Sequence, residues 1–207
     1  MRPRTVLAAL PLLAALLAGP AAALECTLDA AEGPEARWWH AGVWRPLTEA
    51  PLPEAEGVIL ATPAGARVEL LCEDGTRITL GPETEVNLAT LLPAPPHGME
   101  AAAVQLLDGI VGLAVEARRA LGFELRAPLA IASVRSTRWL AEADGAHTAF
   151  FVREGRVRVR PIAAGPSRTL DPGEGLDLRP GEPVGPVVEW GASRVAETRA
   201  RLGLSWR

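Results

Sequence analysis

Short runs of alternating apolar and polar residues make up most of the chain, and turn-forming pairs interrupt these runs about every ten residues. The pairs include Asp74-Gly75, Asp108-Gly109, Asp144-Gly145 and Glu154-Gly155. Alternation with a period of two residues indicates a strand that buries one face, and many short strands at this spacing are typical of all-β domains. We therefore predict an all-β fold in which short hairpins form a compact stack. The stack resembles either a β-roll or solenoid, or a sandwich.

Three segments carry the pattern of a hairpin. Residues 66–80 predict two strands around Asp74-Gly75, with Val68 and Leu70 on one face. Residues 150–161 predict a second hairpin with the valines at 157 and 159 facing inward. The arginines at 153, 156, 158 and 160 are interpreted as a solvated face that discourages pairing of an exposed edge; an anion-binding strip is the alternative. Residues 104–117 predict a third hairpin that turns at Asp108-Gly109.

Helical periodicity is confined to residues 190–203, which end near Gly203. The apolar face of this segment is narrow, so we expect the helix to lie on the β-body rather than inside it. The proline-rich residues 91–99 are interpreted as a connection between two β-halves.

The N-terminus has the composition of a secretory leader. Arg2 and Arg4 precede an apolar run at residues 6–17, and the alanines at 21–23 suit a signal peptidase. We predict a signal peptide at residues 1–23, cleaved near Ala23, followed by a β-domain at 24–189 and a C-terminal helix and tail at 190–207. The apolar run is short for a membrane span, so we expect a periplasmic or secreted protein and not an integral membrane protein; an uncleaved anchor is the alternative.

Charge and residue types narrow the chemistry. A formal net charge of −4 does not favour nucleic-acid binding, which depends on clustered cations. The histidines at 40, 97 and 147 lack partners at metal-ligand spacing, and no Gly-x-Ser-x-Gly elbow is present. We therefore predict no catalytic site, no metal site and no cofactor.

Three of the six tryptophans lie close together at Trp38, Trp39 and Trp44. One interpretation is a stacking platform for sugar rings or for a protein partner. The alternative is that Trp38 and Trp39, as neighbours on a strand, point to opposite sides, so that at least one of them fills the core.

Cys26 and Cys72 are the only two cysteines of the chain. Two cysteines in an exported protein usually pair, so we predict a Cys26–Cys72 disulfide; two free thiols are the alternative.

Residues 133–145 combine arginines, hydroxyls and a tryptophan, which suggests either an anion clamp beside a nucleophile or an ordinary strand. Alternation along one strand places Arg135, Thr137 and Trp139 on one side and separates Arg135 from Ser136. We favour the strand, with Arg135 bracing the fold through hydrogen bonds.

These segments, in this order, resemble the FecR-like domain. Residues 44–88 are similar to its first half, including the Asp74-Gly75 turn, and residues 106–178 are similar to its second half. The resemblance covers about residues 40–178. Its structural signature residues here are Arg135, Thr137, Trp139, Asp74, Gly75 and Gly155. Ser136 stands where the family has glycine, which implies a corner that needs no positive φ, and Trp139 replaces the usual phenylalanine.

Many members of that family are inner-membrane signal regulators with a cytoplasmic anti-sigma segment and a membrane helix. Neither segment is expected here, so the resemblance implies a stand-alone exported β-domain. We expect it to be a non-catalytic module of the cell envelope that binds a protein partner or a cell-wall polymer. Peptidoglycan binding through an exposed tryptophan is one alternative, and an accessory part in envelope-to-cytoplasm signalling is another.

Overall fold

The computed structural model describes residues 26–48, 52, 57–88, 102–116 and 122–206, with strand β8 (Ala102–Val115) described by its side chains only from Val104 onward. The leader predicted at 1–23 and the connection predicted at 91–99 lie outside the described residues. Within the described residues no helix has the length and apolar character needed to span a membrane.

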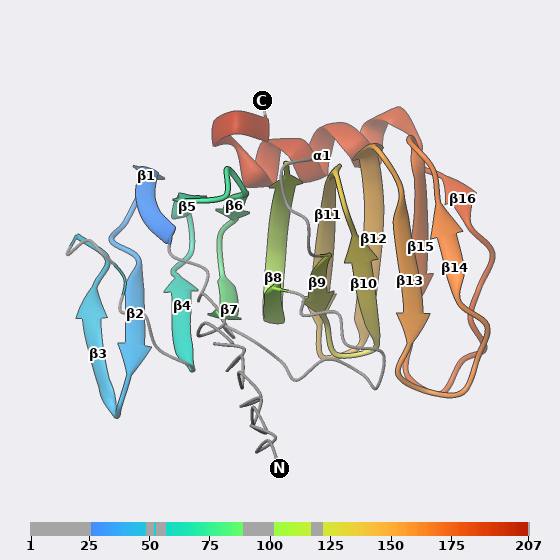
Figure 1. The fold of residues 1–207 in the computed structure, drawn as a ribbon, viewed down its shortest axis with the longest axis horizontal. Helices are drawn as coiled ribbons and strands as arrows, with labels where there is room; N and C mark the ends of the chain where they lie inside the picture. The colour runs from blue at the N-terminus through green and yellow to red at the C-terminus, as the bar shows by residue number, and fades with distance from the viewer. Residues whose placement is uncertain (1–25, 49–51, 53–56, 89–101, 117–121, 207) are drawn as a thin grey trace, which may run out of the picture.

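Sixteen strands, counted over the described residues, form one hydrogen-bonded network that folds into two layers, which we call layer A and layer B (Figure 1). Layer A consists, in spatial order, of β1 (Cys26–Glu32), β5 (Arg67–Cys72), β6 (Arg77–Leu80), the second half of β8, β11 (Thr137–Asp144), β12 (His147–Glu154), β15 (Glu174–Leu178) and β16 (Val188–Glu189). Layer B consists of β3 (Val43–Pro46), β2 (Arg37–His40), β4 (Val58–Thr62), β7 (Thr84–Leu88), the first half of β8, β9 (Phe123–Arg126), β10 (Ala130–Val134), β13 (Val157–Pro161) and β14 (Arg168–Leu170). The sheet is not closed, and the predicted all-β, sandwich-like architecture is confirmed.

Strand β8 belongs to both layers. Its first half pairs with β7 and β9 in layer B, and its second half pairs with β6 and β11 in layer A. The hairpin predicted at residues 104–117 is therefore wrong. Gly109, with a φ of 93°, bends the strand from one layer into the other instead of reversing its direction. A Cβ atom at this position would lie 2.4 Å from the Thr84 hydroxyl oxygen, so only glycine fits the bend.

The other two hairpin predictions have different outcomes. Strands β5 and β6 pair around Asp74-Gly75 as expected, with the buried Val68 and Leu70 on one face. The segment 150–161 is not a hairpin, because β12 lies in layer A and β13 in layer B, with the chain crossing between them at Gly155. The alternation of buried valines and exposed arginines along β13 is nevertheless present.

The main core fills the space between the layers. Its largest fully buried side chains include Trp139, Phe123, Phe150, Leu60 and Leu70, which come from both sheets. Trp139 and Phe150 lie on neighbouring strands with ring centroids 6.3 Å apart. The inward faces of the alternating strands are thus the source of this core, as their period of two residues indicates.

The C-terminal helix α1 (Ala192–Leu202) and the 3-10 turn η1 (Leu204–Trp206) lie across the outer face of layer A (Figure 1). A second apolar cluster joins them to the sheet, with Trp190 and Trp206 at its two ends. Each indole covers a glycine of the sheet, because a Cβ at Gly112 or Gly175 would lie within 2.4 Å of the ring above it. The helix predicted at 190–203 therefore lies on the β-body, as expected from its narrow apolar face.

Candidate binding surface

Strands β2 and β3 form a hairpin at the edge of layer B, and this hairpin carries all three clustered tryptophans. Its two-residue turn is Ala41-Gly42, with φ values of 50° and 86°, the backbone that tight hairpins prefer. Trp38 faces the core and is 6% exposed, with the Arg45 guanidinium 5.2 Å from its ring centroid. Trp38 is therefore a core residue, as the second interpretation of the cluster required.

The opposite face of the hairpin presents the other two tryptophans. Trp39 and Trp44 are directly opposite each other on the paired strands, so their side chains share a face. Trp39 is half-buried, whereas Trp44 is 40% exposed and has the Arg37 guanidinium 5.8 Å from its ring centroid. Val43, next in the chain, points to the other side of the strand and is 48% exposed. We define the hairpin surface as Arg37, Trp39, Val43 and Trp44.

Strand β3 is also an edge. All four of its residues are exposed, and among the described residues it pairs only with β2. An edge strand presents backbone N–H and C=O groups that another extended chain can bind. The hairpin surface therefore combines apolar side chains, cationic side chains and an available backbone ladder.

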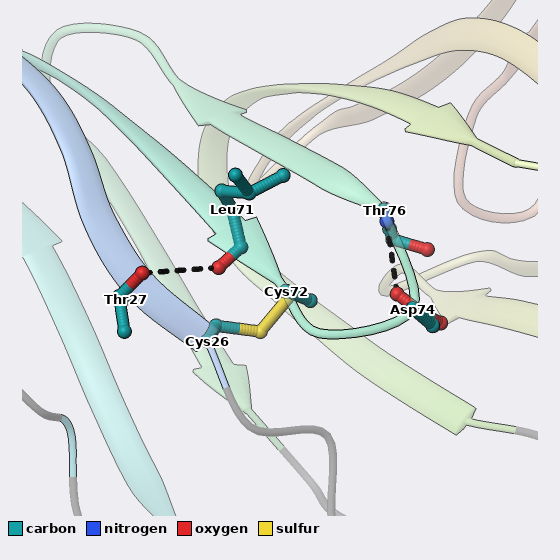
Figure 2. The surroundings of a disulfide bond; sticks show 6 residues. All are labelled: Cys26, Thr27, Leu71, Cys72, Asp74 and Thr76. Atoms are coloured by element: carbon teal, nitrogen blue, oxygen red, sulfur yellow. Dashed lines mark hydrogen bonds between the residues drawn. A yellow bond between two sulfur atoms is a disulfide. The ribbon is translucent and has the colours of Figure 1, made fainter.

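The predicted disulfide is present at the same end of the molecule, where β1 forms the edge of layer A (Figure 1). Cys26 and Cys72 face each other on β1 and β5, with Cα atoms 3.9 Å apart. Figure 2 shows the bond beside the Thr27 hydroxyl, which donates to the Leu71 carbonyl at 3.4 Å. The disulfide fixes the first strand to the edge of layer A.

Two of the signature residues shape the β5–β6 turn beside this disulfide (Figure 2). The Asp74 carboxylate accepts a hydrogen bond of 2.9 Å from the backbone N–H of Thr76. Gly75 follows with a φ of 86° and donates its N–H to the Cys72 carbonyl. Both residues therefore set the reversal of the chain, which is a structural role.

The stretch 133–139 is not one strand. β10 ends at Val134 in layer B, the chain turns at the exposed Arg135 and Ser136, and β11 begins at Thr137 in layer A. The prediction that Arg135 shares a side with Thr137 and Trp139 and braces the fold is wrong. Within the described residues the Arg135 guanidinium has no hydrogen bond or ion pair.

The other signature residues at this corner, Thr137 and Gly155, lie in contact with each other. The Thr137 hydroxyl donates to the Arg156 carbonyl at 3.2 Å, and a Cβ atom at Gly155 would lie 2.9 Å from that hydroxyl. Ser136 has no positive φ, as its replacement of a glycine implied. Thr84 and Gly109 repeat the same threonine–glycine contact at another crossing between the layers. Thr137 and Gly155 are therefore corner residues that let the chain change layers, whereas Asp74 and Gly75 form a turn within layer A.

Sequence reasoning missed an ionic cluster beneath α1. The Arg194 guanidinium donates two hydrogen bonds to the Asp177 carboxylate, at 2.6 and 2.9 Å, and His147 Nε2 lies 2.7 Å from the same carboxylate. Burial by itself raises the pKa of Asp177, but the hydrogen bonds from Arg194 and His147 outweigh it and lower that pKa. The cluster holds the helix on layer A, and no local spacing could reveal it because its members are far apart in sequence.

No metal site can be identified in the described parts of the chain, where no three His, Cys, Asp or Glu side chains lie together in a metal-binding arrangement.

The predicted arginines at 153, 156, 158 and 160 do not form one row. Arg153 belongs to layer A, whereas the other three follow the crossing into layer B. Arg156 forms an exposed ion pair with Asp171 at 2.8 Å.

Comparison with known proteins finds a family match in the middle of the chain. The family model described as FecR protein matches residues 59–158. Two crystal structures of a protein from Parabacteroides distasonis ATCC 8503, assigned as an anti-sigma factor, share the fold at a TM-score of 0.51 and 18% identity. Each covers 64% of this chain, which in turn spans 59% of their length. No curated protein matches the chain.

Proposed function

Because residues 59–158 match the FecR family model, we propose that this chain is a non-catalytic module of the cell envelope that binds another envelope protein through the hairpin surface. The corner residues Thr137 and Gly155 lie inside the matched region and serve the fold. The hairpin surface lies before it, at residues 37–46, so the FecR domain acts as a scaffold that carries an additional element. This separation of scaffold and additional element supports a binding function rather than a catalytic one.

The observation that carries the proposal is the exposed edge strand β3. An extended segment of a partner can add to this edge through backbone hydrogen bonds, while Val43 and Trp44 contact its apolar side chains. The exposed Arg37 and Arg45 flank these residues and favour acidic groups on the partner. The partner segment is therefore an extended protein segment with apolar and acidic residues.

Site-specific photo-crosslinking tests this proposal. A photoreactive residue at position 44 is expected to give a discrete adduct with one envelope protein, and a V43D substitution is expected to remove it. Position 162 is the matched control, because Ile162 is an exposed hydrophobic residue (59% exposed) outside the hairpin surface. The same set of adducts at both positions would contradict the proposal.

A second candidate ligand is the glycan of the cell wall. Trp39 and Trp44 form a partly exposed aromatic pair on one face, and such a pair can stack on sugar rings. In this case co-sedimentation with purified peptidoglycan would depend on Trp44 and would be unaffected by V43D. Sedimentation that is equal in W44A and in the unchanged protein would exclude the glycan.

The fold shared with an anti-sigma factor supports a further candidate, an accessory part in envelope signalling. Deletion of the gene would then change transcription from a promoter under extracytoplasmic control, and V43D would reproduce the change if the partner is a signalling protein.

Export is part of all these proposals. Mass spectrometry of the protein from the periplasmic or secreted fraction is expected to show an N-terminus near Leu24.

A further inference from the structure

Two arginines from different elements contact Trp206 on the outer face of layer A, and a third arginine lies on the strand that pairs with one of them. Arg199 of α1 donates its Nε–H to the Trp206 carbonyl at 2.9 Å. Arg138 of β11 places its guanidinium 5.2 Å from the centroid of the Trp206 ring and donates to the Ser205 carbonyl. Arg153 of β12 is the third member, and we call the three residues the arginine cluster.

The position of Arg153 results from an irregularity in the strand pairing. Arg138 pairs with Glu154, but the next residue, Trp139, pairs with Val152, so Arg153 is the extra residue of a β-bulge. Bulges redirect a side chain and are frequent beside functional sites. Here the bulge leaves Arg153 near two other cations. Burial, followed by the positive charges of Arg138 and Arg199, lowers the pKa of Arg153.

The arginine cluster has hydrogen-bond donors that no described residue uses. Arg138 Nε and Arg153 Nη1 are both buried and lack a partner within the described part of the chain. A buried donor without an acceptor is unfavourable, and a guanidinium prefers the planar oxygen pairs of oxyanions. The two unused donors therefore indicate a missing acceptor.

The charges of the arginine cluster are also unbalanced. Glu154 is its nearby carboxylate, 3.7 Å from Arg153 Nε and 66% exposed. Two other acidic residues of this face are engaged elsewhere, Glu142 with Arg201 and Glu69 with Arg77. Among the described residues, these three guanidinium groups and one nearby carboxylate leave an excess of two positive charges, which a dianion would neutralise.

We propose that the arginine cluster binds a small dianionic oxyanion of the phosphate or sulfate class. The Trp206 ring lies against the Arg138 guanidinium and holds it at the site, and the fork-shaped donors of Arg138 and Arg153 suit the oxygens of a tetrahedral oxyanion. The site lies on layer A, whereas the hairpin surface belongs to layer B, so this proposal is independent of the proposed function.

Titration calorimetry with inorganic phosphate and with sulfate, at constant ionic strength, tests the site. Saturable binding is expected for both anions and not for chloride or acetate. The R153Q variant is expected to bind at least about tenfold more weakly, since a charge-assisted hydrogen bond is lost. R160Q is the matched control, because Arg160 is an exposed arginine of layer B, and its binding should be unchanged.

A second variant keeps the test decisive if R153Q folds poorly. E154Q removes an exposed carboxylate that competes for Arg153, so it is expected to tighten phosphate binding. Phosphate binding that is unchanged in R153Q, weaker in E154Q, or matched by chloride would overturn the proposal. A general salting effect of sulfate would appear equally in R153Q and in the unchanged protein, and that result also counts against the site.

Discussion

Gly155 lies so close to Ser136 that a Cβ atom at position 155 would be 2.4 Å from the Ser136 carbonyl oxygen. The two residues belong to different crossings between the layers, one leading from layer B to layer A and the other leading back. Their contact fixes where the chain leaves each sheet. The atom that a side chain at position 155 would meet belongs to the backbone, so it cannot rotate away as the end of a flexible side chain could.

Replacement of Gly155 by alanine is therefore expected to destabilise the protein by about 3 kcal/mol, through a strained φ and a backbone overlap. Gly145 provides the control, because it lies in the β11–β12 turn and a Cβ there meets nothing within 4 Å. Urea denaturation of G155A and G145A checks the difference. Equal midpoints for the two variants would show that the crossing can relax.

Loss of the Cys26–Cys72 disulfide should lower the free energy of unfolding by about 2–4 kcal/mol, because the bond closes a long loop in the unfolded chain. The C26S/C72S variant is the simplest test by thermal or urea denaturation. Adding reductant should shift the melting temperature of the unchanged protein toward that of the variant and leave the variant unaffected. A reductant effect of the same size on both would point to another cause.

The Asp177 ion cluster predicts a loss of stability in acid. The folded-state pKa of Asp177 is lowered, so its stabilising effect is complete above the unfolded-state value and disappears as the pH falls through the folded-state pKa, below about 4. At neutral pH, D177N is expected to cost about 1–3 kcal/mol, since Arg194 and His147 lose their charged acceptor.

D171N serves as the comparison for D177N, because Asp171 pairs with the fully exposed Arg156 and its loss should change stability little. Denaturation midpoints measured between neutral pH and strong acid should show a flatter profile for D177N than for D171N. Parallel profiles would mean that the cluster beneath α1 does not control the acid response.

The two faces of the hairpin should respond differently to truncation. W38A removes a core side chain and is expected to lower the free energy of unfolding by about 3–5 kcal/mol. W44A removes an exposed side chain and should lower it by less than about 1 kcal/mol. Melting temperatures check this difference, and partner crosslinking checks function. A large destabilisation by W44A would make the aromatic pair a structural feature instead of a binding surface.

Arg135 is expected to tolerate substitution. The strand interpretation predicts a lower melting temperature for R135A. The exposed position at the corner instead predicts that the free energy of unfolding changes by no more than about 0.5 kcal/mol. Denaturation of R135A beside T137A, which loses the buried hydroxyl at the same corner, separates the two views. Strong destabilisation by R135A alone would restore the bracing role.

Local sequence was sufficient where neighbouring residues decide the structure. The Asp74-Gly75 turn, the inward valines of β13 and the burial of one of the two adjacent tryptophans, Trp38, all follow from alternation and turn chemistry. It failed at Gly109 and Gly155, because a glycine with positive φ can close a hairpin or send the chain into the other layer. Only the strands that pair beyond the glycine distinguish these outcomes, and those partners are distant in sequence.

The candidate sites show the same division. The clustered tryptophans could be recognised from their spacing, and opposite-facing neighbours predicted that one of them is buried. The arginine cluster could not be recognised, because it depends on a one-residue shift in the pairing of β11 with β12 and on a helix that is distant in sequence from both strands. Register and docking of the C-terminus are properties of the folded molecule.

The shared strand β8 has a mechanical consequence. Residues on either side of Gly109 are covalently continuous yet belong to different layers, so tension applied to one sheet passes directly to the other. Because the two halves of β8 pair with different strands, a force that separates the layers acts on the hydrogen bonds of both halves.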